Sequence, residues 1–295
     1  MSKEFFEDTN FRQETVIVIL QAIEILDEYA SQGYDLSLRQ LYYQLVSRDL
    51  IPNTDRDYKR LGGIVKNARL AGLMDWEMIV DRGRWTDFQS TWESPAEIIA
   101  SAAESFRIDK WETQGRHIEV MVEKAALEGV LIPVCHELQI RFTANKGYLS
   151  TSAMYKIGKR LRHFAWLGKT CHVLYLGDHD PSGLDMDRDI FDRLDMFSEG
   201  GIDNVKRLAL TMDQINEYNP PENPTKLKDS RASDYIYQYG MSSWELDALE
   251  PSVLAELVTS AVINLRQEPD WIDALEKEAE MRTQLEDMAA ELEEE

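Results

Sequence analysis

Short apolar segments alternate with amphipathic ones between residues 117 and 210, and this alternation is the strongest constraint on the fold. Four apolar segments have the length of buried strands: 117–122, 139–143, 172–177 and 207–210. Helical patterns separate them at 123–131, 151–166 and 183–197. Strands that alternate with helices through short connections pair in parallel. We therefore expect a mixed α/β fold whose helix-covered parallel sheet lies within residues 115–267.

The N-terminal part has a different pattern, in which three helical segments precede one short strand. The helices are expected at 11–31, 38–47 and 57–71, and alternating polarity predicts the strand at 74–81. The basic residues Arg82 and Arg84 follow in a turn. This order is typical of a winged-helix DNA-binding domain, which we place at 1–90.

The C-terminal end carries much of the chain's negative charge. The net charge is −22, and residues 268–295 alone hold 12 acids and two bases, with apolar residues at steps of three and four. This spacing predicts an acidic amphipathic helix. Packing on its own domain is the simplest interpretation of that helix, and dimerisation or mimicry of nucleic acid is the alternative. A connector at 91–114, with one helix at 95–106, joins the two predicted domains.

Composition excludes several classes of protein. No stretch approaches the roughly 18 consecutive apolar residues of a membrane helix, and the N-terminus lacks the pattern of a signal peptide. Cys135 and Cys171 are the only cysteines. Each adjoins a histidine, but without a Cys-x-x-Cys element we expect them in the core rather than at a zinc ion. These features favour a soluble cytoplasmic protein, associated with the nucleoid if it binds DNA.

Two segments are basic against the acidic background. Residues 37–84 hold nine bases and six acids, and residues 141–169 hold seven bases and no acid. A basic helix face can follow a phosphate backbone, although it can also neutralise the protein's own acids. Ten residues are candidates for contact with double-stranded DNA: Lys59, Arg60, Lys66, Arg69, Arg82, Arg84, Lys146, Lys156, Lys159 and Arg160.

Three acids follow predicted strands of the sheet. Glu123 comes directly after the strand at 117–122, and Asp178 and Asp180 follow the strand at 172–177. Parallel α/β sheets bind ligands at the carboxyl ends of their strands, and carboxylate oxygens suit Mg²⁺ or Mn²⁺. Asp178 to Gly183 is also a good helix-start sequence, which is the structural alternative.

These motifs resemble a known family. Val120-Met121-Val122-Glu123-Lys124 and Gly177-Asp178-His179-Asp180-Pro181-Ser182-Gly183 are similar to the Toprim motifs of the topoisomerase VI A subunit and its meiotic break-forming relatives. The chain's length resembles that of the stand-alone Mini-A members. The resemblance implies a Mg²⁺ site at Glu123, Asp178 and Asp180, and a homodimer in which tyrosine and metal come from different protomers. It also implies a separate ATPase subunit for any topoisomerase cycle, because this chain shows no ATPase motif.

The segment Leu38-Arg39-Gln40-Leu41-Tyr42-Tyr43 resembles the active-site helix of the same family. The resemblance gives Tyr43 the role of nucleophile and Arg39 that of the motif's arginine. Tyr42 continues an apolar helix face and is expected in the core, whereas Tyr43 lies off that face and is expected to be exposed. A phenol with a pKa near 10 is a poor nucleophile at pH 7, so nearby cations must favour its ionised form.

The expected function is Mg²⁺-dependent double-strand DNA cleavage through a 5′-phosphotyrosyl intermediate. Two alternatives remain: a Toprim nuclease that hydrolyses DNA without a covalent intermediate, and a DNA-binding module without catalysis. Glu245 and Asp247 follow the last predicted strand. They could join the metal site, although a surface position is the simpler expectation.

Overall fold

The sheet of the α/β part has four parallel strands. The computed structural model describes residues 3–80, 90–145 and 147–294. Its strands are β1 (Arg116–Val122), β2 (Arg141–Ala144), β3 (Thr170–Leu176) and β4 (Asn204–Ala209), in the order β2-β1-β3-β4. The two central strands are almost completely buried. The predicted parallel sheet and mixed α/β class are therefore confirmed.

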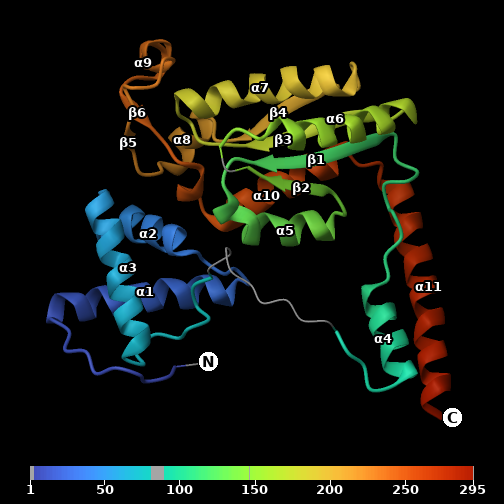
Figure 1. Cartoon of the computed structure of the whole chain (residues 1–295), viewed down its shortest axis with the longest axis horizontal. Helices are drawn as coiled ribbons and strands as arrows, with labels where there is room; N and C mark the ends of the chain where they lie inside the picture. Colours follow the sequence, from blue (N-terminus) through green and yellow to red (C-terminus); the bar gives the residue numbers. More distant parts are fainter. Residues whose placement is uncertain (1–2, 81–89, 146, 295) are drawn as a thin grey trace.

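Helices cover both faces of this sheet (Figure 1). Helices α5 (Glu128–Glu137) and α10 (Pro251–Leu265) cover one face, and α6 (Thr151–Trp166) and α7 (Pro181–Ser198) cover the other. Side chains alternate accordingly: Val122 and Leu176 pack toward α5 and α10, whereas Met121 and Tyr175 pack toward α6 and α7. The helix expected at 123–131 begins later, because η1 (Ala125–Leu127) precedes α5.

Three N-terminal helices form a separate apolar core. They are α1 (Gln13–Ser31), α2 (Leu38–Ser47) and α3 (Asp55–Leu70), and their buried side chains include Ile25, Leu41 and Leu61. Helix α2 begins with a capping box, in which the Ser37 hydroxyl accepts from the Gln40 N–H and the Gln40 side chain accepts from the Ser37 N–H.

The strand predicted at 74–81 is wrong for its described residues. Residues 74–80 form bends with a single bridge between Ile79 and Leu36. The Arg69 guanidinium donates to the carbonyls of Trp76 and Ile79 at 2.7 and 2.8 Å, and an Asp75 carboxylate oxygen accepts from the Glu77 N–H. Side chains thus satisfy backbone groups that a strand would pair with a neighbour. The basic turn at Arg82 and Arg84 lies outside the described residues.

The connector and the acidic end pack together. Helix α4 (Pro95–Ser105) lies along α11 (Glu268–Glu294) (Figure 1). Beyond α4, the Lys110 ammonium forms a buried ion pair with Glu278 at 2.6 Å, and the rings of Trp111 and Trp271 meet edge to face. This arrangement confirms the predicted acidic helix. Among the described helices, none has the length and apolar character needed to cross a membrane.

The segment between β4 and α10 joins the two cores. It contains α8 (Met212–Tyr218), α9 (Ala232–Tyr239), η2 (Leu246–Ala248) and the short antiparallel pair β5 (Asn223–Pro224) and β6 (Ser242–Ser243). Element η2 packs against α2, and Ala248 belongs to the N-terminal core. The chain therefore places residues 245–248 between the helix that carries Tyr43 and the carboxyl edge of the sheet.

Candidate functional site

Glu123 and Asp178 lie at the carboxyl ends of the central strands, where the sequence places them. The Glu123 N–H donates to the Leu176 carbonyl and so continues the pairing of β1 with β3. Its carboxylate accepts from the Asp178 N–H at 2.8 Å and from the Tyr175 hydroxyl at 3.3 Å. One hydrogen bond, from the Asp178 backbone N–H to the Glu123 carboxylate, therefore holds the two predicted ligands together.

Asp180 begins helix α7. Its Oδ1 atom accepts from the Gly183 N–H at 2.6 Å and from the Ser182 hydroxyl at 2.7 Å, as an N-cap residue does. The other oxygen, Oδ2, lies 3.7 Å from the Lys226 ammonium. A Cβ atom at Gly183 would lie 2.2 Å from the Asp178 carbonyl, so the tight approach of helix to strand requires glycine. Asp180 therefore caps the helix, as the structural alternative predicted, and its second carboxylate oxygen lies outside the cap.

The carboxylates at this edge are poorly hydrated. Burial raises the pKa of Asp178 to about 7, against the opposing effect of Lys124, and burial also raises the pKa of Glu123. Burial and the neighbouring carboxylates disfavour the ionised forms of both groups. A cation bound at this edge would favour those ionised forms.

Lys124 connects this edge to Glu245 and Asp247. Its ammonium lies 3.0 Å from Asp178, 2.7 Å from Glu245 and 2.9 Å from Asp247. On the far side, Arg39 forms ion pairs with both Glu245 and Asp247, the latter at 3.1 Å. Asp247 is 1% exposed. The expectation of a surface position is therefore wrong for Asp247, because η2 lies between the two cores.

Tyr43 lies at the end of this charged network but is not exposed. It is 4% exposed and in edge-to-face contact with Tyr42. The centre of its ring lies 5.9 Å from the central carbon of the Arg39 guanidinium. Burial and the carboxylates of Glu245 and Asp247 raise its pKa, and Arg39 acts in the opposite direction. The prediction of an exposed Tyr43 is wrong, since α2 is covered by the N-terminal core on one side and η2 on the other. Tyr42 is in the core as expected.

A small pocket reaches Tyr43 from the solvent. It has a volume of about 320 Å³ and lies between helices α2 and α3 and strand β5. Tyr43, Arg39 and Glu245 line it together with Asn53 and Asn223. The pocket therefore gives the buried tyrosine and its arginine a route to a ligand.

The three predicted metal ligands carry the type of donor atom that a hard divalent cation prefers. Glu123, Asp178 and Asp180 offer only carboxylate oxygens, which Mg²⁺ and Mn²⁺ prefer. Among the described residues, no three His, Cys, Asp or Glu side chains are already arranged as a metal-binding group. At present the Lys124 ammonium supplies the charge beside Asp178. The three residues therefore have suitable donor atoms for the cation. Binding of a cation at this site would require the Lys124 ammonium to move away from Asp178.

The candidate DNA-binding residues differ in whether their positive charges already have partners within the protein. Arg69 binds backbone carbonyls, and Arg160 makes a bidentate ion pair with the buried Glu119. Lys159 lies 3.6 Å from Glu199, and Arg60 lies 3.9 Å from Asp57. Three others are exposed: Lys59, Lys66 and Lys156. Arg82, Arg84 and Lys146 lie outside the described residues.

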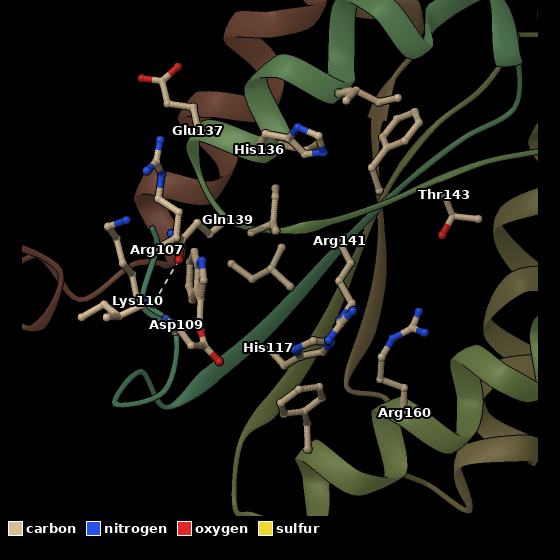
Figure 2. A pocket seen from close by; sticks show the side chains of 18 of the residues that line it. Arg107, Asp109, Lys110, His117, His136, Glu137, Gln139, Arg141, Thr143 and Arg160 are labelled. Carbon is tan, nitrogen blue, oxygen red and sulfur yellow. Dashed lines mark hydrogen bonds between the residues drawn. The ribbon is translucent and has the colours of Figure 1, made fainter. Parts of the chain in front are cut away.

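A second cavity, of about 1160 Å³, runs along the free edge of strand β2. Figure 2 shows His117, Arg141 and Arg160 on one side of it. His117 stacks on Phe164 at 3.7 Å and, with Arg160, contacts Glu119, whose pKa these partners lower against the effect of burial. The charge of Arg160 is thus used within the fold.

Sequence reasoning overlooked Lys124 and Asn145. Lys124 is part of the motif around Glu123, but its contacts with three carboxylates depend on η2. Asn145 follows β2 as Glu123 follows β1, and its N–H donates to the Val122 carbonyl at 2.7 Å. The rule that strand ends carry ligands could have found Asn145.

Cys135 and Cys171 are buried and free, as expected, and burial raises the pKa of each thiol to about 12. They belong to apolar cores on opposite faces of the sheet.

Comparison of the chain with models of protein families, with curated proteins and with solved structures found no match. The functional argument therefore depends on the residues of this chain.

Proposed function

We propose that this protein cleaves double-stranded DNA in a Mg²⁺- or Mn²⁺-dependent transesterification by Tyr43. In this proposal the N-terminal helices serve as a winged-helix-like DNA-binding domain and the sheet as a Toprim domain. The observation that carries it is the continuous network from Arg39, beside Tyr43, through Glu245 and Lys124 to Asp178. Two motifs 135 positions apart in sequence, from Tyr43 to Asp178, are thereby joined.

The chain's own groups have distinct tasks in this reaction. Glu123, Asp178 and Asp180 would hold the divalent cation, which supplies positive charge to the phosphate undergoing attack. The Tyr43 oxygen forms a bond to phosphorus while the bond from phosphorus to the 3′ oxygen breaks. The phenol loses one proton and the departing 3′ oxygen gains one. Arg39, whose charge is fixed at neutral pH, stabilises the phenolate and the phosphate.

Plasmid cleavage tests the proposal. Supercoiled plasmid is incubated with the full-length protein and Mg²⁺ or Mn²⁺, stopped with detergent, and run with and without protease treatment. We expect cut DNA with protein attached to its 5′ ends, which Tyr43→Phe abolishes. Tyr237→Phe is the matched control, because Tyr237 is 92% exposed on α9 and remote in sequence from both motifs. Protein-linked cleavage by Tyr43→Phe at the wild-type rate would refute the role of this tyrosine.

Hydrolysis without a covalent intermediate is a second candidate, and the burial of Tyr43 favours it. A buried phenol with a raised pKa is a weak nucleophile unless DNA binding changes its surroundings. Glu123, Asp178 and Asp180 would have the same tasks, with water as the nucleophile. Cut DNA with free 5′-phosphate ends, unaffected by Tyr43→Phe, would support this function over transesterification.

A further inference from the structure

Asn145 has an amide that the described part of the chain leaves without a partner. The residue is 1% exposed, and neither Oδ1 nor Nδ2 makes a hydrogen bond to any described residue. Its backbone N–H is satisfied by the Val122 carbonyl, whereas the two polar atoms of its side chain have no partner among the described residues. Buried amides nearly always have partners, because losing hydration without a replacement is unfavourable. An amide in this position can therefore accept a bound group, either a ligand or an enclosed water.

The pairing of β2 with β1 places this amide beside Glu123. Ala144 lies opposite Val122 in the register, so the next position places Asn145 opposite Glu123. Ala144 packs toward the α5 side of the sheet, and side chains alternate along a strand, so Asn145 belongs to the other side. Glu123 is on that same side, as its contact with the Tyr175 hydroxyl shows. Neighbouring strands are about 4.8 Å apart, which brings the two side chains within reach of one ligand.

We propose that Asn145 is a binding residue of the Glu123, Asp178 and Asp180 site, with its amide oxygen directed at the divalent cation. This inference deepens the proposed function and rests on it. Amide oxygens are hard ligands that accompany carboxylates at such cations.

A titration of the full-length protein with Mn²⁺, without DNA, tests the assignment. Free Mn²⁺ is measured by electron paramagnetic resonance, and the thermal unfolding midpoint is recorded without metal. We expect Asn145→Leu to weaken Mn²⁺ binding about ten- to a hundredfold, with a metal-free midpoint equal to or above that of the wild type. Asn145→Asp retains the oxygen ligand and retains Mn²⁺ binding. Asn264→Leu is the control, because Asn264 is exposed on α10, and leaves affinity unchanged.

Two results would overturn the inference and are distinguishable. If Asn145→Leu lowers the metal-free midpoint and binds Mn²⁺ as the wild type does, the amide is structural and an enclosed water satisfies it. In that case, loss of Mn²⁺ binding in Glu123→Gln would still support the cation site at Glu123, Asp178 and Asp180 without Asn145. If the wild type itself binds no Mn²⁺, the cation-dependent function fails together with the inference. Asn145→Ala, which removes the amide without adding bulk, gives the same comparison if the leucine variant does not fold.

Discussion

Replacing Arg160 with methionine tests whether this residue serves the fold or DNA. Glu119 is 0% exposed, and its carboxylate has three contacts, of which Arg160 supplies two at 2.7 and 2.6 Å. His117 supplies the third at 2.9 Å. Arg160→Met therefore leaves a buried carboxylate with one partner, and the main consequence is a loss of stability.

The size of this loss follows from burial. Removing one partner of a buried ion pair costs about 3–5 kcal/mol. The Arg160 side chain is 28% exposed, so water can partly replace the guanidinium, and His117 keeps its contact. We expect a loss of about 3 kcal/mol in the free energy of unfolding at pH 7, the lower end of that range. The double variant Arg160→Met with Glu119→Leu recovers most of it, because no buried charge remains.

The loss also depends on pH. Arg160 and His117 lower the pKa of Glu119 below that of the unfolded chain. The stability that this carboxylate contributes is therefore complete above the unfolded value, near pH 4.5, and is lost as the pH falls through the folded value. The difference between wild type and Arg160→Met should narrow below that pH.

Urea unfolding, followed by tryptophan fluorescence, measures both effects. Lys156→Met, one turn away on α6 and exposed, is the control and should change stability by no more than about 0.5 kcal/mol. A loss below about 1 kcal/mol for Arg160→Met, together with weaker DNA binding in a folded protein, would refute this reasoning. Arg160 would then contact DNA as the charge pattern first suggested.

Three further predictions concern Lys124, the turn at Gly183 and the proposed homodimer. Lys124→Met leaves the buried Asp247 with Arg39 as its remaining ion-pair partner among the described residues and should lower the free energy of unfolding by about 3 kcal/mol, with Asp247→Asn recovering part of it in a double-mutant cycle by urea unfolding. Gly183→Ala forces a Cβ atom against the Asp178 carbonyl and should cost more than about 1 kcal/mol, and an unchanged thermal midpoint would contradict the tight turn. Mixing Tyr43→Phe with Glu123→Gln protein should restore plasmid nicking if tyrosine and carboxylates act across a homodimer. Mixtures that stay inactive would assign the reaction to one chain, as the contact of Arg39 with Glu245 in a single chain allows.

Local patterns were sufficient to predict the four strands of the sheet, the helices between them, the N-terminal and connector helices and the C-terminal helix, whereas α8, α9, α10 and the pair β5 and β6 were not predicted. The apolar segments became strands of a parallel sheet, and the helical spacings became helices within a few residues of the expected bounds. The acids Glu123 and Asp178 reached one edge because the ends of parallel strands always meet there. The acidic C-terminal helix followed from its spacing in the same way. These features depend on near neighbours in the chain, which the sequence displays directly.

Only the tertiary structure decided the environment of each candidate side chain. Tyr43 is buried because η2, about 200 positions later, covers the outer side of its helix. The Arg160 guanidinium is already paired because Glu119 faces it from strand β1. The strand predicted at 74–81 does not form over its described residues, 74–80, because Arg69 binds the carbonyls of Trp76 and Ile79. Exposure, charge pairing and backbone satisfaction are set by groups distant in sequence, so residue type and spacing alone do not determine them.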